Sequence, residues 1–137
     1  MATNTTLRWI PGGSRFVSTD STGHSVVMSK PDENTGMKPS ELILSALAGC
    51  SSVDVVGILE KKQTPLTYLE VQVTSEQDAD PPWTFRKIYM KFIVKGEGLT
   101  EKSVEQAIKL SEEKYCSVAA TLRGEAEIIT SFEILQD

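Results

Sequence analysis

The sequence predicts an α+β fold in the order βββ-α-ββ-α-β, with two helices packed against a largely antiparallel sheet. Three observations support this prediction. Short apolar segments separated by turn residues fill the first part of the chain, a long and almost uniformly apolar helical segment follows, and the second half holds two alternating segments, an amphipathic helix and a closing strand. A chain of 137 residues has the usual size of one domain, so we expect a single domain over residues 1–137.

The N-terminal strands are short and bounded by turns. Residues 5–10, 16–19 and 26–28 are the strand candidates, and the Pro-Gly-Gly sequence at 11–13 turns the chain after the first of them. Residues 30–38 are polar and contain proline, asparagine and glycine, so we expect a loop there.

The longest predicted helix spans residues 39–62. Pro39 suits the first helical turn because its missing N–H would have no partner there, and Glu41 favours the same positive end of the helix dipole. Apolar side chains cover nearly the whole circumference of this helix rather than one stripe, so it must be covered on all sides. Since a domain this small can hardly enclose such a helix alone, we expect a second subunit to cover it.

The remainder of the chain alternates between strand and helix patterns. Residues 68–74 alternate between apolar and polar side chains, residues 83–95 form a second long strand, and we expect the two to pair as a hairpin. An amphipathic helix spans residues 100–116, a short turn spans 118–122, and a closing strand spans 126–135.

Composition argues against several classes of function. Fourteen basic and 19 acidic residues give a net charge of −5, and the basic residues are scattered, so we expect no nucleic-acid partner. One histidine, His24, and two distant cysteines do not supply a zinc ligand set. No uninterrupted apolar run of roughly eighteen residues occurs, so we expect no membrane span. The N-terminus lacks the pattern of a secretory signal, so we expect a cytoplasmic protein.

The two cysteines are the candidates for reactive chemistry. Cys50 lies inside the apolar helix, where a cysteine is most often inert, and Asp54, one turn away, would raise its pKa. Cys116 lies at the end of the second helix and can also begin the following turn, whose N-terminus would favour a thiolate. A permanent disulfide is not expected in a reducing compartment, but two cysteines that face a shared core could close a reversible one. Their spacing in the sequence does not show whether they meet.

Two segments carry a resemblance to a known family. Residues 36–56 (GMKPSELILSALAGCSSVDVV) and residues 109–124 (KLSEEKYCSVAATLRG) resemble the OsmC/Ohr family of osmotically inducible and organic-hydroperoxide-resistance proteins. The likeness extends over nearly all of the chain, because the β-rich N-terminus, the Pro-x-Glu-Leu helix start, the hairpin and the second cysteine-bearing helix also match. It implies an OsmC-like fold and an intertwined homodimer, in which sheets from both subunits wrap two central helices.

The resemblance also implies an activity. In the catalytic members of the family the earlier cysteine attacks the hydroperoxide, so Cys50 would become a sulfenic acid, and Cys116 would condense with it to a disulfide. An external dithiol would then reduce that disulfide by exchange. The implied function is thiol-dependent reduction of organic hydroperoxides in defence against oxidative stress, with no metal or bound cofactor.

The residues that would activate the thiol depart from the family pattern. Active members carry a glutamate directly after the proline that precedes the helix, whereas this chain has Ser40 there and Glu41 one residue later. That glutamate holds an arginine from the N-terminal strands, so Glu41 is a candidate to orient Arg15 or Arg123, our candidate thiolate-stabilising cations. Each arginine also has a simpler interpretation, as a solvated turn residue or as cover for a sheet edge. The departure places the chain nearer the less characterised OsmC-like branch than the dedicated organic peroxidases.

One alternative belongs to another functional class. The chain could be a non-catalytic binding protein that holds a small hydrophobic ligand in an apolar dimer cleft, with both cysteines serving only as packing. Peroxide consumption by the wild type and by Cys50→Ser distinguishes the two hypotheses.

Overall fold

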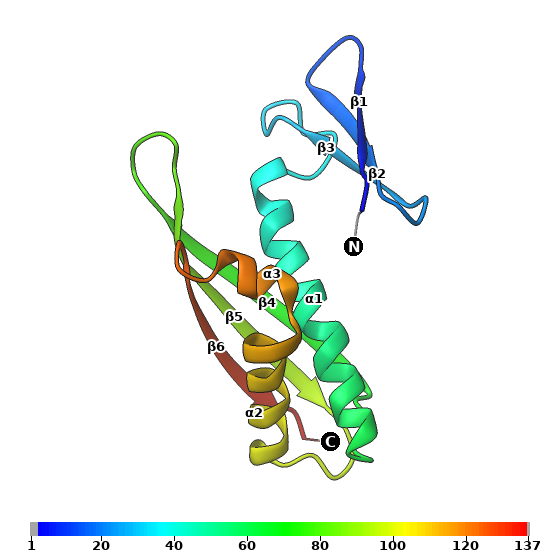
Figure 1. The fold of residues 1–137 in the computed structure, drawn as a ribbon, viewed down its shortest axis with the longest axis vertical. Coiled ribbons are helices and arrows are strands. Elements are labelled where there is room, and N and C mark those ends of the chain that lie inside the picture. Colours follow the sequence, from blue (N-terminus) through cyan, green and yellow to red (C-terminus); the bar gives the residue numbers. More distant parts are fainter. Residues whose placement is uncertain (1–2, 137) are drawn as a thin grey trace. The chain divides into compact units, whose positions relative to one another are not determined.

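The computed structural model describes residues 3–136, which divide into two compact units, Met1–Ile43 and Leu44–Asp137. The element order is three strands, a long helix, two strands, a helical region and a last strand (Figure 1). This α+β arrangement confirms the predicted fold class. The prediction of one domain over the whole chain stays a prediction.

The first unit is built on a three-stranded antiparallel sheet, in the order β1 (Thr6–Ile10), β2 (Arg15–Thr19) and β3 (Ser25–Ser29). The three predicted strands are therefore confirmed, with their ends shifted by one residue at most. Gly12, in the first turn, has a φ of +103°, a backbone conformation that side chains other than glycine rarely adopt. The fully buried hydroxyl of Ser29 accepts hydrogen bonds from the N–H groups of residues 35 and 36, at 3.1 and 3.0 Å, and so fixes the loop that leads to the long helix.

Helix α1 (Pro39–Lys61) begins at the predicted residue and ends one residue before the predicted end. Its buried residues follow helical spacing and form one stripe: Leu44, Leu47, Ser51, Val55 and Leu59. Apolar side chains on the remainder of the helix stay exposed within one chain, and Val53 is 75% exposed. This pattern agrees with the expectation that one copy of the chain does not enclose the helix.

The same helix bears on the expectation that no segment spans a membrane. That expectation considered only uninterrupted apolar runs. Among the described residues, α1 is long enough and, with a mean hydropathy of 2.0 in its window, apolar enough to cross a bilayer by length and composition. Only 22% of that window is buried within the chain. A core helix that other protein surfaces cover passes the same test, so the length and hydropathy of α1 are weak evidence for a membrane span.

The second unit contains a sheet in the order β4-β5-β6, formed by Tyr68–Gln77, Phe85–Lys95 and Glu127–Ile134. Strands β4 and β5 form the predicted antiparallel hairpin. Strand β6 pairs with β5 in parallel, while the β1–β2, β2–β3 and β4–β5 pairings are antiparallel, as expected for a largely antiparallel arrangement. Parallel neighbours need a long crossover, and the helical region between β5 and β6 supplies it (Figure 1).

That crossover consists of three helical pieces: α2 (Glu101–Leu110), a π-helical turn η1 (Ser111–Tyr115) and α3 (Ser117–Leu122). Thr100 begins α2 with a reciprocal capping box, in which its hydroxyl accepts from the Ser103 N–H at 3.1 Å and the Ser103 hydroxyl accepts from the Thr100 N–H at 3.2 Å. The predicted single helix over residues 100–116 therefore changes to π geometry after residue 110.

The core of the second unit forms where alternate residues of β5 meet the helices. Ile88, Met90, Phe92 and Val94 are at most 2% exposed, as expected for one face of a strand. They share one cluster with buried residues of α1, α2 and α3, including Leu47, Val55, Leu59, Val104, Ala107, Ile108 and Ala119. Both cysteines belong to or pack against this cluster, so the core positions them.

Candidate active site

The structure brings the two cysteine side chains together. Cys50 lies in the middle of α1 and is half-buried, and Cys116 lies between η1 and α3 and is 2% exposed. Both are free thiols, and the thiol of Cys116 donates a hydrogen bond to the sulfur of Cys50. The pair is therefore already close enough to interact in the reduced state, which the sequence spacing could not show.

A π-helical turn places Cys116 at this point. The N–H of Cys116 bonds to the carbonyl of Ser111, five residues earlier, at 2.7 Å. Cys116 then leaves helical geometry, with φ −80° and ψ 105°, and becomes the N-cap of α3. Its sulfur accepts the N–H of Ala119 at 3.4 Å, as N-cap side chains do.

The surroundings of Cys50 favour its thiolate. Burial is the largest single influence and opposes ionisation, but four hydrogen bonds together outweigh it and lower the pKa of Cys50 below its ordinary value. The donors, in order of effect, are the Cys116 thiol, the Val118 N–H, the Ser117 hydroxyl and the Ser117 N–H. The two N–H groups belong to the first turn of α3, where helical N–H groups lack intrahelical partners.

Cys116 has the opposite character. Burial, followed by the hydrogen bond that it donates to Cys50, raises the pKa of Cys116 to about 11. Of the two thiols, Cys50 is therefore the one whose proton leaves more readily, and Cys116 stays protonated as its donor. The pair thus divides into one thiolate-forming and one proton-holding cysteine.

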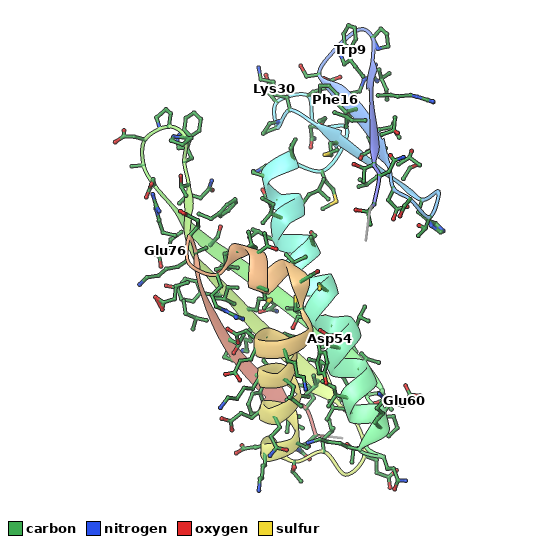
Figure 2. The ribbon with its side chains drawn as sticks, in the orientation of Figure 1. Trp9, Phe16, Lys30, Asp54, Glu60 and Glu76 are labelled. Atoms are coloured by element: carbon green, nitrogen blue, oxygen red, sulfur yellow. The ribbon has the colours of Figure 1, made fainter. Side chains whose placement is uncertain are left out.

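The sequence-based account of this pair needs two corrections. We expected the turn after Cys116 to favour the Cys116 thiolate. Burial and the hydrogen bond to Cys50 outweigh the N–H groups of Ala119 and Val118, which do lower the pKa of Cys116, and the N–H groups of Ser117 and Val118 also act on Cys50. We also expected Asp54 to raise the pKa of Cys50. Asp54 lies on α1 (Figure 2). Its carboxylate accepts a hydrogen bond from the Ser111 hydroxyl at 2.7 Å, and the principal influences on the pKa of Cys50 come from other groups.

Arg15 and Glu41 both lie in the first unit, and each has a partner there. The Nε of Arg15 is 3.1 Å from Oε1 of Glu33, and Oε2 of the same carboxylate accepts a hydrogen bond from the Ser14 N–H. Glu41, our candidate orienter of an arginine, pairs with Lys38 at 3.1 Å. Sequence reasoning missed Glu33 because it lies in a polar loop, distant from Arg15 in sequence and outside any recognisable motif.

Arg123 lies at the C-terminal end of α3. Its side chain is exposed, and its guanidinium donates a hydrogen bond to the backbone carbonyl of Glu112 in η1. This contact ties the end of α3 to the π-helical turn. The hydrogen bonds that shift the pKa values of the two thiols come from other groups, so the role of Arg123 as a thiolate-stabilising cation stays a prediction.

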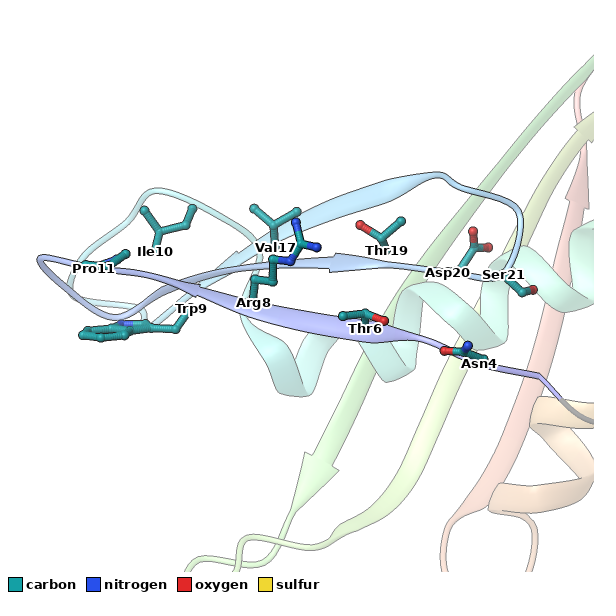
Figure 3. Close-up of a pocket in the computed structure, with 10 residues that line it drawn as sticks. All are labelled: Asn4, Thr6, Arg8, Trp9, Ile10, Pro11, Val17, Thr19, Asp20 and Ser21. Atoms are coloured by element: carbon teal, nitrogen blue, oxygen red, sulfur yellow. The ribbon is translucent and has the colours of Figure 1, made fainter.

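Two hollows on the surface differ in their relation to the thiols. One, of about 720 Å³, lies along β1 and β2, is lined by residues of the first unit that include Arg8 and Trp9, and contains neither cysteine (Figure 3). The other, of about 440 Å³, lies in the second unit and begins at Val53 and Asp54, one helical turn after Cys50. Its further lining is mixed, with the apolar or aromatic side chains of Ile58, Leu110 and Tyr115 beside Gly57, Lys61 and Lys62. Within residues 3–136 no cluster of three or more histidine, cysteine or acidic residues is suited to a metal ion.

Comparison with known proteins agrees with this architecture. A family model described as OsmC-like protein matches residues 31–131. The chain is 36% identical to protein YhfA of Escherichia coli K12 over 129 residues, which cover 94% of this chain and 96% of YhfA.

Solved structures share the fold. A hypothetical protein from Aquifex aeolicus VF5 is 29% identical with a TM-score of 0.88, and the match covers 100% of this chain and 98% of that one. The organic hydroperoxide resistance protein OhrB of Bacillus subtilis has a TM-score of 0.65 at 18% identity, and the match covers 97% of this chain and 98% of that one.

Proposed function

Because this chain belongs to the OsmC-like protein family, we propose that its paired thiols reduce organic hydroperoxides. The observation that carries the proposal is the hydrogen-bonded pair in which Cys50 has a lowered pKa and Cys116 a raised one. The name of the B. subtilis protein of the same fold, which refers to organic hydroperoxide resistance, supports the substrate class.

The first step is attack by Cys50. Its thiolate attacks the terminal oxygen of the hydroperoxide, the O–O bond breaks, and the leaving alkoxide takes up a proton to give an alcohol. The sulfur gains that oxygen as a sulfenic acid and is oxidised by two electrons. The Ser117 hydroxyl and the N–H groups of residues 117 and 118 hold the attacking thiolate in place.

The second step is resolution by Cys116. Its sulfur attacks the sulfenic sulfur of Cys50, the S–S bond forms, and the sulfenic hydroxyl leaves with the Cys116 proton as water. An external dithiol then restores both thiols by exchange and is itself oxidised to a disulfide. The cycle needs no metal or bound cofactor, and a reducing cytoplasm would supply the dithiol.

The proposal extends to the charged residues and to a second subunit. Arg15, held by Glu33, and Arg123 are candidates to stabilise negative charge as the O–O bond breaks.

A second copy of the chain would cover the exposed apolar side of α1, where Ile43, Val53 and Val56 are at least 39% exposed. The hollow that begins one turn after Cys50 has Ile58, Leu110 and Tyr115 in its lining, and these side chains would contact the organic group of a hydroperoxide.

Intact-mass measurement after treatment with tert-butyl hydroperoxide tests the cycle. The wild type is expected to lose two hydrogens as the disulfide forms, and dithiothreitol is expected to reverse this change. Cys116→Ser is expected to gain one oxygen and then a second one, since Cys50 can be oxidised but not resolved.

Cys50→Ser is the matched control, because it keeps the size of the side chain and removes the nucleophile. If the wild type and Cys50→Ser consume the hydroperoxide with dithiothreitol at equal, background rates, the reductase proposal fails. The binding-protein alternative would then be favoured, and a ligand that copurifies in native mass spectrometry would support it.

A further inference from the structure

A partly buried polar contact joins the two helical segments that carry the cysteines. The Ser111 hydroxyl donates to the carboxylate of Asp54 at 2.7 Å, and it lies 3.3 Å from the Ser51 hydroxyl. Ser111 is fully buried and Ser51 is 2% exposed, although apolar side chains form the remainder of this interface. Figure 2 shows Asp54 on α1 in this part of the second unit.

Core packing alone does not explain these groups. A buried polar side chain loses its hydration and contributes little net stability even when it is hydrogen-bonded. Alanine or valine at the same places would satisfy the core without that cost. The contact is therefore better explained by what it holds in place.

Ser111 is connected to both cysteines. Through its hydroxyl it is bonded to Asp54, one turn after Cys50 on the same helix. Through its carbonyl it accepts the Cys116 N–H at 2.7 Å and closes the π-helical turn. One residue thus ties the segment that carries one sulfur to the segment that carries the other.

The π-helical turn sets the direction of Cys116. Each residue added to a regular helix rotates the side-chain direction by about 100°, so a change from π to α geometry would turn Cys116 away from its present direction. The Ser111–Asp54 bond lies at the first residue of η1, where helical geometry changes. It is therefore placed to hold this register.

We propose that Asp54 and Ser111 are positioning residues that hold the Cys116 sulfur within disulfide-forming reach of Cys50. The inference rests on the proposed disulfide cycle and concerns its second step, in which the S–S bond forms and water leaves. Because the effective concentration of one thiol toward the other falls when their geometry is no longer held, loss of the contact disfavours closure of the disulfide both in rate and at equilibrium.

The test measures disulfide formation without peroxide. The purified full-length protein is equilibrated in mixtures of reduced and oxidised dithiothreitol, and the Cys50–Cys116 disulfide is quantified by mass after acid quenching. Ser111→Ala and Asp54→Ala are each expected to lower the equilibrium constant for disulfide formation by about tenfold or more. Asp54→Asn keeps an oxygen acceptor for the Ser111 hydroxyl, so its equilibrium constant for disulfide formation is expected to stay within about threefold of the wild-type value.

Ser29→Ala is the matched control for stability. It removes an equally buried, hydrogen-bonded serine hydroxyl from the other compact unit, and it is expected to leave the equilibrium constant unchanged. If Ser111→Ala does not fold, Asp54→Ala decides the question, since the Asp54 side chain is only partly buried. Wild-type equilibrium constants in folded Ser111→Ala or Asp54→Ala would overturn the proposal.

A second measurement separates this proposal from the proposed function. Under repeated additions of tert-butyl hydroperoxide, Ser111→Ala is expected to accumulate sulfinic acid at Cys50, because slower resolution leaves the sulfenic acid open to further oxidation. Failure of the wild type to consume hydroperoxide would overturn the reductase function alone. The dithiothreitol equilibrium would still decide whether the Ser111–Asp54 contact positions the thiols.

Discussion

Replacement of Ser117 by alanine is the most direct test of how the fold activates Cys50. The Ser117 hydroxyl donates to the Cys50 sulfur, whereas the N–H groups of residues 117 and 118 do not depend on this side chain. Ser117 is the exposed first residue of α3, so alanine fits the helix without a change in packing. The substitution therefore removes one donor and leaves the others.

The size of the effect follows from the strength of one hydrogen bond to a charged group. Such a bond contributes about 1.5–3 kcal/mol when desolvated, and solvent screening at the half-buried Cys50 reduces this to about 1 kcal/mol. A change of that size lowers the thiolate fraction about fivefold at pH values below the pKa. The pKa of Cys50 rises in the variant, so its reactivity profile moves to higher pH while the plateau stays the same.

The assay is the rate of alkylation of Cys50 by iodoacetamide between about pH 5 and pH 10, with the modified cysteine identified by peptide mass mapping. Thr121→Ala is the control, because it also removes a hydroxyl from α3. The Thr121 hydroxyl donates to the Ser117 carbonyl at 2.8 Å and not to a sulfur. Equal profiles for the wild type and Ser117→Ala would refute the assignment of this hydroxyl as a thiolate donor.

Three further predictions address stability, assembly and the charged residues. The pKa of Cys116 is raised to about 11 in the folded protein, above the ordinary thiol value of 9.0. The stability that comes from its neutral form is therefore fully present below pH 9.0 and is lost as the pH rises through about 11. Urea denaturation should therefore show a steeper loss of stability above about pH 9 in the wild type than in Cys116→Ala, and parallel curves would contradict this. Val53→Lys should raise the dissociation constant of the proposed dimer at least about a hundredfold, as measured by sedimentation velocity. About 1.5 kcal/mol from burial of the valine side chain is lost twice, because a two-fold interface contains the residue from both subunits. An unchanged sedimentation profile would place Val53 outside the interface. If Arg15 acts in the reaction, Glu33→Gln should lower kcat/KM for hydroperoxide about tenfold, and Glu41→Gln should lower it less. A larger loss in Glu41→Gln would instead indicate that Glu41 is the partner of Arg15.

The elements of the fold were largely predictable because their signals are local. Turn residues between short apolar segments located the three N-terminal strands, and a proline at the first helical position located the start of α1. The apolar circumference of α1 also predicted the exposed side chains that the structure shows, such as Val53. The direction of β6 was not predictable in this way, because parallel and antiparallel strands have similar sequences and differ only in the connection between them.

The candidate site was predictable only in part. The family resemblance directed attention to Cys50 and Cys116, but burial, the hydrogen bond between the two thiols, backbone N–H groups and a serine hydroxyl set their pKa values. Backbone N–H groups occur at nearly every position, so no residue pattern marks the ones that lack partners at the start of α3. The ion pair of Arg15 with Glu33 was missed for a related reason, since loop geometry decides which of several nearby acids an arginine meets.

Side-chain periodicity and turn chemistry were thus sufficient to establish which segments are strands and helices, and the family resemblance indicated which thiols to consider. The contact between those thiols, the π-helical turn that aims Cys116 and the opposite shifts of the two pKa values came from tertiary packing alone. The physical reason is that a hydrogen bond or a desolvation effect acts over a few ångströms, and only the folded chain brings groups distant in sequence to that separation.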